Sequence, residues 1–359
     1  MSSLDQLRKQ VVRASLFPAC SLADAIDRLR FVQADPIRSP ARAQDLILRH
    51  RVTDYRSGDL ERVYPDLQLE ECFLYAYGFL PKELWQVIHP KAHKKHSRSE
   101  EMILEIIRNF GPMHPKQIES HIAGKRVRNY WGGFSRTGKM SMDSLHNRGA
   151  LRIAHRNRGI RVYEVAEPFE PSLSKKERFK AILLSTLKSM GPTTRTFLVS
   201  ELTHFGYLVK PLEARRMCLQ ELIDTGQIRA DEVDSVEYIS LDQAAPKGAL
   251  SDRVRILAPF DPIVRDRARF EHLWNWTYRF EAYTSKAKRK LGYYAMPVLW
   301  RDWVIGWANA NVENEQLIIE FGYVKNHPKS REYRKAAKQE AARLAKFLGL
   351  EQTQVQTNL

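Results

Sequence analysis

The chain has 359 residues, of which 43% are hydrophobic, and a net charge of +16. This length and apolar content allow two to four domains with a sizeable core, and the charge favours a polyanionic partner, because lysine and arginine neutralise the phosphates of nucleic acids. No run of 18 apolar residues occurs and the N-terminal stretch lacks the apolar core of a secretory signal, so we expect no membrane association and a cytoplasmic location at the bacterial nucleoid. Three widely separated cysteines fit reduced thiols better than disulfides or a zinc site.

Two polar residues follow a short helix in the first segment. Residues 4–15 have the apolar spacing of an amphipathic helix, and further helices are expected at 21–30, with Ser21 as the N-cap, and at 41–51. Proline disfavours helical dihedrals in the residue before it, so Pro36 predicts an extended turn at Asp35. Side chains alternate in extended chain, which places Gln33 and Asp35 on one side, where an amide and a carboxylate can hold a water molecule. A solvated turn with a local Asx-type hydrogen bond is the alternative.

The next segment, residues 89–168, is the most basic. Residues 89–164 contain 16 lysines and arginines against 6 aspartates and glutamates. Helices are expected at 100–109, 115–121 and 137–147, followed by strands at 149–153 and 161–165 around the turn Asn157-Arg158-Gly159. This is the order of a winged helix, whose last helix commonly enters the major groove of DNA.

A second copy of this order is expected over residues 172–243. A helix is predicted at 175–190, Gly191-Pro192 repeats Gly111-Pro112, and residues 219–229 and 236–239 parallel 143–152 and 161–165. The turn at 231–234 is acidic, so this copy is expected to serve architecture more than phosphate binding.

The last segment, residues 250–359, changes to short apolar or alternating runs. Five of them, 254–257, 278–283, 293–299, 303–308 and 316–321, predict the strands of a small barrel or sandwich. A final amphipathic helix is expected from Lys329 to Leu348, with Gly349 as its stop. The sequence therefore predicts an α+β protein in which tandem winged-helix modules precede a C-terminal β-barrel and a terminal helix, with 1–88 as a helical or winged-helix first module.

Histidines at 89, 93 and 96 have a spacing that would suit a metal on a helix. No carboxylate or cysteine lies near them to complete a ligand set, and Pro90 interrupts the helix. We therefore expect no metal and no cofactor.

Several segments together resemble one known family. The run FVQADPIRSPARAQDLILRHRV, the aromatic stretch CFLYAYGFLP, the segment LAPFDP with Arg265-Asp266-Arg267, and KRKLGYYAMP at 288–297 are similar to the AlkZ/YcaQ-like DNA glycosylases, in the branch with a Gln-x-Asp motif. Two departures stand out: Tyr75 or Tyr77 replaces a histidine of many relatives, and Gly306 to Ala310 replaces a usually charged strand.

The resemblance implies winged helices with a barrel, double-stranded DNA as substrate, and a monomeric, monofunctional glycosylase that excises alkylated purines with water and unhooks interstrand crosslinks. Gln33 and Asp35 are then the expected catalytic residues. The expected DNA contacts, from the basic modules and the resembling barrel segments, are Arg38, Arg42, Arg136, Lys139, Arg152, Arg156, Arg158, Arg161, Arg265, Arg267, Lys288 and Arg289.

Two other functions remain open from the sequence. A non-catalytic winged-helix regulator of duplex DNA explains the charge equally well, because a fold does not establish chemistry. An RNA-binding factor is the third reading.

Overall fold

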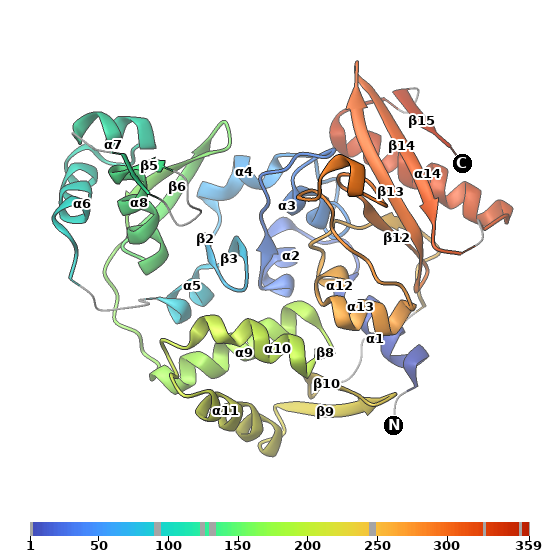
Figure 1. The fold of residues 1–359 in the computed structure, drawn as a ribbon, viewed down its shortest axis with the longest axis horizontal. Helices are drawn as coiled ribbons and strands as arrows, with labels where there is room; N and C mark the ends of the chain where they lie inside the picture. Colours follow the sequence, from blue (N-terminus) through green and yellow to red (C-terminus); the bar gives the residue numbers. More distant parts are fainter. Residues whose placement is uncertain are drawn as a thin grey trace. The chain divides into compact units, whose positions relative to one another are not determined.

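The computed structural model describes residues 3–89, 95–122, 126–128, 134–243, 249–325, 328–351 and 354–358. It forms two compact units (Figure 1). The first consists of Met1–Asp59, Leu183–Leu202 and Leu219–Leu359, and the second of Leu60–Ile182 and Thr203–Cys218. No helix in the described part of the chain is both long and apolar enough to span a membrane.

The first unit begins with two capped helices, of which the second has the predicted cap, Ser21. Ser3 caps α1 in a capping box with Gln6, and the hydroxyl of Ser21 accepts from the amide of Asp24 at the start of α2. The helix expected at 41–51 is shorter, because the chain turns after Leu48 and the side chain of Arg51 enters the interior. The elements here are α1 (Leu4–Ser15), α2 (Leu22–Leu29), β1 (Val32–Gln33) and α3 (Ala43–Leu48).

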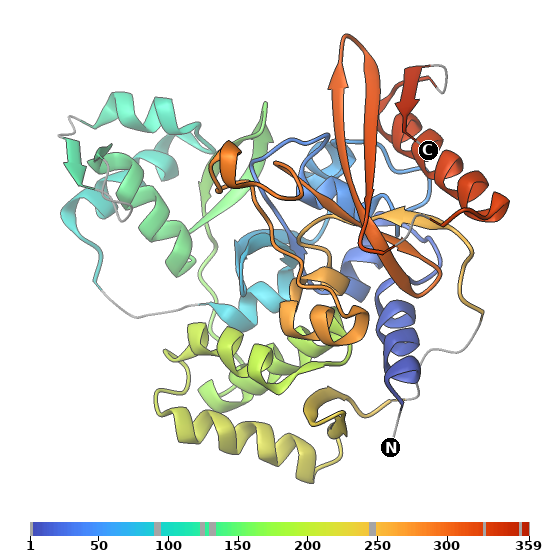
Figure 2. The ribbon, with the colours of Figure 1, turned by 45° about the vertical axis from the view of Figure 1, so that its right-hand side comes forward.

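A five-stranded sheet dominates the rest of this unit. Its strand order, β11-β12-β13-β14-β15, leaves β11 and β15 as edges, so the predicted barrel is present in part, as an open, curled sheet. Helix α14 packs beside β11 and β15, and the long β13–β14 hairpin is seen clearly in Figure 2. The bounds are β11 (Val254–Ile256), β12 (Met296–Trp300), β13 (Trp303–Glu313), β14 (Gln316–Tyr323), α14 (Arg331–Leu348) and β15 (Val355–Thr357).

The strand predicted at 278–283 is wrong, because this stretch has no regular secondary structure. Its polar groups bond to loops instead of to a strand: the hydroxyl of Tyr278 donates to the carbonyl of Ala295 at 2.6 Å, and Glu281 accepts three backbone amides. Side-chain hydrogen bonds here take the place of a ladder.

A small three-stranded sheet and short helices complete the first unit. Thr193 and Thr194 form β8, which pairs with β10 in the order β8-β10-β9. The apolar face of α1, with Leu7, Val11 and Val12, packs in one buried cluster with residues of β10, α12 and α13. The elements are β8 (Thr193–Thr194), α10 (Arg195–Leu202), β9 (Ile228–Val233), β10 (Val236–Leu241), α12 (Pro262–Arg265), α13 (Arg267–Trp274) and η3 (Lys286–Lys288); α9 (Lys175–Met190) and α11 (Leu212–Asp224) each run from one unit into the other.

The second unit contains a hairpin that the sequence did not reveal. Strands β2 and β3 pair Leu69 with Pro81 and Phe73 with Tyr77. In the described residues after it, helices α5, α6 and α7 precede the β4–β5 pair, and helix α8 precedes the β6–β7 pair; a bridge joins Met113 to Tyr163. The predicted helix at 115–121 is confirmed. The elements are α4 (Asp59–Val63), η1 (Tyr64–Asp66), β2 (Leu69–Phe73), β3 (Tyr77–Pro81), α5 (Lys82–Ile88), α6 (Arg98–Phe110), α7 (Pro115–His121), β4 (Arg126–Arg128), β5 (Phe134–Arg136), α8 (Thr137–Arg148), β6 (Leu151–Asn157), β7 (Ile160–Val165) and η2 (Thr203–Phe205).

Candidate active site

Gln33 and Asp35 lie at the end of β1, each with only 9% of its surface exposed. One oxygen of Asp35, Oδ1, accepts a hydrogen bond from the amide of Ile37 at 2.8 Å, which is the Asx-type contact expected of a simple turn. Within the described residues the other oxygen, Oδ2, has no hydrogen-bond partner. A buried carboxylate thus keeps one oxygen available for a bound molecule.

An arginine from a distant segment fixes the orientation of Gln33. Nη1 of Arg265, at the end of α12, donates to Oε1 of Gln33 at 2.9 Å, and its Nη2 lies 3.4 Å from Oε2 of Glu201. A guanidinium can only donate, so the oxygen of the Gln33 amide must face Arg265. The amide nitrogen of Gln33, two residues before Asp35 in the chain, is left as a donor.

Two tyrosines, Tyr283 and Tyr294, lie within electrostatic range of the Asp35 carboxylate. Burial raises the pKa of Asp35, and the amide of Ile37 opposes the rise only in part. Burial, and after it the charge of Asp35, raise the pKa of both Tyr283 and Tyr294. Within the described residues the buried hydroxyl of Tyr294 has no hydrogen-bond partner, and its ring packs edge-on against Phe280 with centroids 5.2 Å apart. A buried hydroxyl without a partner is unusual and marks a place for a water or substrate atom.

A network of backbone hydrogen bonds holds the tyrosine loop. Oε2 of Glu281 accepts from the amides of Lys290, Leu291 and Gly292 at 2.9, 2.8 and 3.3 Å, and Nδ2 of Asn309 donates to the carbonyl of Leu291 at 2.8 Å. Gly292 has φ of +124°, and a Cβ there would lie 2.3 Å from Oδ1 of Asn309. Only glycine fits at this position.

Buried ion pairs anchor the helix that carries Arg265. Asp261, the N-cap of α12, accepts from Nη1 and Nη2 of Arg51 at 2.8 and 2.9 Å, and both side chains are fully buried. Asp266, just after α12, accepts from the side chain and amide of Thr194. Because both ends of α12 are fixed, the position of Arg265 is fixed as well.

The expected DNA contacts of the first unit have different surroundings. Arg38 and Lys288 are exposed, whereas Arg42 is partly buried at the N-cap of α3 and has an interaction partner. Arg267 donates to the carbonyls of Val264 and Pro259, both at 2.9 Å. Nε of Arg289 donates to the carbonyl of Thr284 at 2.8 Å. Arg267 and Arg289 thus take part in the fold.

In the second unit, three of the expected contacts are engaged with partners of the same unit. Arg152 pairs with Glu70 and Glu164, and Arg156 donates to both oxygens of Glu71 at 2.7 and 2.6 Å. The guanidinium of Arg161 lies 3.9 Å from the ring centroid of Tyr77. Arg158, in the β6–β7 turn, and Lys139 on α8 are exposed, and the side chain of Arg136 lies outside the described part. The exposed pair is the better placed for phosphates.

The carboxylates of β2 explain why these arginines turn inward. Glu71 is fully buried; burial opposes its ionisation, but the hydrogen bonds and charge of Arg156 hold its pKa below the usual value. The hydroxyl of Tyr77, at one of the positions where relatives carry histidine, lies 2.9 Å from Oε2 of Glu71 and 3.1 Å from Nε2 of His146. Tyr77 is thereby part of this buried network.

Sequence reasoning missed several residues of the site. Arg265 was expected to bind DNA, and its contact with Gln33 joins positions 232 residues apart, which no local pattern shows. Tyr294 was noticed only as part of a motif, and Glu281 was assigned to a strand that does not form. The doubled Tyr293-Tyr294 after a glycine was the available signal.

We found no candidate metal site in the described part of the chain, where no three His, Cys, Asp or Glu residues cluster suitably. His93 lies outside the described residues.

The fold is similar to that of a solved protein structure. The structure is similar to that of the Streptomyces sahachiroi DNA glycosylase AlkZ, with a TM-score of 0.63 and 14% sequence identity over 99% of each chain. This likeness defines the class of fold as that of an AlkZ-type α+β protein. A model of the AlkZ-like DNA glycosylase family matches residues 26–347, so the chain belongs to the AlkZ-like DNA glycosylase family. The resemblance noted from the motifs is thereby confirmed, and membership supports a DNA glycosylase role.

Proposed function

We propose that this protein is a monofunctional DNA glycosylase that hydrolyses the N-glycosidic bond of alkylated, cationic purines. One observation carries the proposal: the buried carboxylate of Asp35 has a free oxygen beside an amide that Arg265 orients. Because Asp35 is only 9% exposed and one of its oxygens has no partner in the described residues, this oxygen can accept from a water molecule or a substrate atom.

The residues suit a dissociative hydrolysis. A purine alkylated at N7 or N3 is already a cationic leaving group, so the sugar passes through an oxocarbenium-like state. The negative charge of Asp35 stabilises this cation and orients or deprotonates the attacking water, more strongly than in bulk water because the site is buried. The amide nitrogen of Gln33 and the hydroxyl of Tyr294 supply further hydrogen bonds to the water or the sugar.

The motif also argues against lyase chemistry. Residues 31–37, FVQADPI, contain no lysine or other amine that could form a Schiff base with the sugar. Water is therefore the nucleophile in this proposal.

We further propose that residues 89–168 and 172–243 are winged helices that hold duplex DNA, beside the module at 1–88 and the sheet region at 250–359. Both segments have the order of three helices and two strands, and in both a residue after a Gly-Pro turn pairs with the second strand: Met113 with Tyr163, and Thr193 with Ile239. The exposed cations Arg38, Lys139, Arg158 and Lys288 would contact phosphates. Action as a monomer and the opening of interstrand crosslinks belong to the same proposal.

A direct assay tests the activity. The protein is incubated with a duplex that carries one 7-methylguanine, and abasic sites are detected as strand breaks after alkali; a second duplex carries a nitrogen-mustard crosslink. We expect breaks at the lesion and none in undamaged duplex. If the protein binds the lesion duplex but releases no base, it is a DNA-binding regulator and the proposal is wrong.

A further inference from the structure

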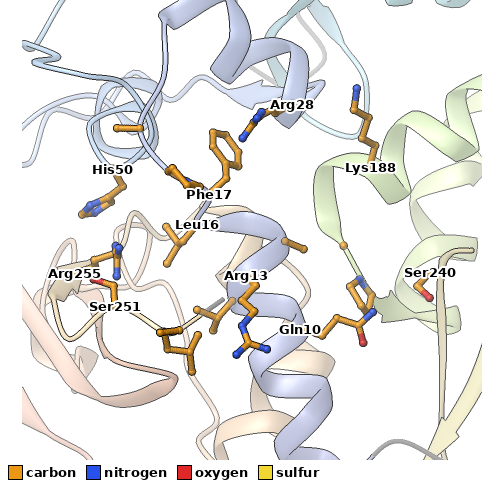
Figure 3. A pocket seen from close by; sticks show the side chains of 18 of the residues that line it. Gln10, Arg13, Leu16, Phe17, Arg28, His50, Lys188, Ser240, Ser251 and Arg255 are labelled. Carbon is orange, nitrogen blue, oxygen red and sulfur yellow. The ribbon is translucent and has the colours of Figure 1, made fainter. Parts of the chain in front are cut away.

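A second cavity, of about 830 Å³, lies in the first unit (Figure 3). The end of α1, the loop after it, helix α2 and the segment before β11 supply its walls, and neither Gln33, Asp35, Arg265 nor Tyr294 lines it. Nothing in the proposed glycosylase chemistry uses this cavity.

The cavity wall is strongly basic. Arg13, Arg28, Arg253 and Arg255 line it, and no carboxylate is among its lining residues. Two further cations there are neutralised, since Lys188 pairs with Asp27 and Arg301 with Asp252. Within the described residues the four arginines make no ion pair.

Two of these arginines are partly withdrawn from water. The Nε atom of Arg13 is buried and has no hydrogen-bond partner in the described part of the chain. Burial lowers the pKa of Arg255 to about 10, so it remains charged at neutral pH. The charge of Glu340 compensates the burial of Arg255 only in part, and no ion pair within 4 Å is formed in the described residues. Partly desolvated cations of this kind are unfavourable, and an anion in the cavity would relieve this.

Apolar side chains form another part of the wall. Leu16, Phe17, Leu241 and Leu250 contribute to it, and the guanidinium of Arg28 lies 5.0 Å from the ring centroid of Phe17. His50 adds no charge, because burial lowers its pKa well below the usual value. A ligand for this cavity therefore needs an anionic part and an apolar or aromatic part.

The volume of the cavity favours a small molecule over a DNA duplex as its ligand. Cavities that enclose small ligands typically measure roughly 300–1,000 Å³. A DNA duplex cannot enter such a space and could only lie across its opening.

From this combination we propose that the cavity binds a small phosphorylated molecule of the nucleotide class. Arg13, Arg253 and Arg255 hold the phosphates, and the Phe17 wall packs against the base. The nucleotide site does not depend on the proposed glycosylase activity, so a test can reject one of these two proposals and leave the other standing.

Calorimetric titration of the full chain tests the site with adenosine diphosphate, inorganic pyrophosphate and adenosine. We expect saturable binding of adenosine diphosphate, weaker binding of pyrophosphate, and none of adenosine. Loss of one charged hydrogen bond should weaken adenosine diphosphate binding about tenfold or more in Arg13→Gln and Arg253→Gln. Arg108→Gln is the matched control, because Arg108 is exposed on α6 in the other unit and should bind as the wild type does.

Three results would overturn the inference. The first is no saturable binding by the folded wild type, and the second is equal affinity in Arg253→Gln and Arg108→Gln. The third is that Arg253→Gln loses affinity for a short DNA duplex but not for adenosine diphosphate, which would assign the cavity to DNA phosphates. Arg253 is exposed and uses no side-chain partner in the described residues, so this variant keeps the test valid if Arg13→Gln unfolds.

Discussion

Asp35 is a carboxylate whose burial opposes its ionisation. Its folded pKa therefore lies above the unfolded value of about 3.9, and the folded state binds the proton more tightly than the unfolded chain does. The ionised form lowers stability at every pH above the folded pKa, and this loss disappears below the unfolded pKa. In the proposed function, the carboxylate of Asp35 serves the reaction at the expense of stability.

The raised pKa of Asp35 leads to a prediction on stability. Asp35→Asn should raise the melting temperature at pH 7–8 by about a degree or more, and the difference should shrink as the pH falls towards about 4. The amide of Ile37 keeps its acceptor in this variant. Thermal melts of both proteins across this pH range measure the difference in melting temperature. A variant less stable than the wild type at pH 8 would show that the charge of Asp35 stabilises the fold.

Arg265 should act on the reaction through Gln33. Arg265→Gln frees the amide of Gln33, so we expect the single-turnover excision rate to fall about tenfold or more while duplex affinity changes little. Lys288→Gln, at an exposed position, should lower duplex affinity and leave the single-turnover excision rate nearly unchanged. The experiment compares rates at saturating enzyme with binding titrations for both variants.

Glu201→Gln is the control for Arg265, because it removes the charge that Arg265 pairs with and leaves Gln33 unchanged. It should keep the wild-type rate. If Arg265→Gln weakens binding and leaves the rate intact, Arg265 is a phosphate contact, as the sequence alone suggested.

Tyr294 should donate a hydrogen bond in the reacting complex. Tyr294→Phe removes only the buried hydroxyl, which lacks a partner in the described residues, so the fold should be as stable as before or more stable. We expect the excision rate to fall about threefold to tenfold with unchanged DNA affinity. An unchanged rate, measured under single-turnover conditions, would restrict Tyr294 to packing.

At the scale of elements, local patterns predicted the helices well and the pairing of distant segments poorly. Residues 4–15, 115–121 and 175–190 are helices with the predicted bounds, since their caps and apolar spacing are local. The β2–β3 hairpin was missed because Glu70 and Glu71 look like exposed residues. They are buried against Arg152 and Arg156, about 80 residues later in the chain.

In the β6–β7 hairpin, Arg156 should serve stability and Arg158 should serve DNA binding. Arg156→Ala leaves buried Glu71 without its main partner and should lower the free energy of unfolding by about 3–5 kcal/mol. Arg158→Ala should leave stability unchanged and reduce the slope of log affinity against log salt by roughly 0.9. Denaturation curves and salt titrations measure the two effects.

If Arg156→Ala is as stable as the wild type, the ion pair with Glu71 contributes nothing. An unchanged salt slope in Arg158→Ala would make this turn a solvated surface. The single variants are needed because a triple variant of Arg156, Arg158 and Arg161 could lose DNA binding through unfolding alone, since Arg156 supports the fold.

For the whole molecule, composition indicated the class of partner but overstated the positive charge that is available to bind it. The excess of positive charge in residues 89–164 includes Arg148, Arg152 and Arg156, which pair with Glu100, Glu70 and Glu71. A count of charges does not show such pairs. The family was recognisable because its motifs are contiguous, whereas the contact that orients Gln33 depends on the folded chain.

The excision reaction itself gives the most direct test of the role of Asp35. In a single-turnover time course on duplex with 7-methylguanine, Asp35→Asn should be slower than the wild type by about 10² or more, since it removes one preorganised charge. Gln33→Ala should lose less, and both should bind DNA as the wild type does. Asp66→Asn, which removes an exposed carboxylate in the second unit, should have the wild-type rate. A folded Asp35→Asn protein that excises the base at the wild-type rate would contradict the catalytic role of Asp35.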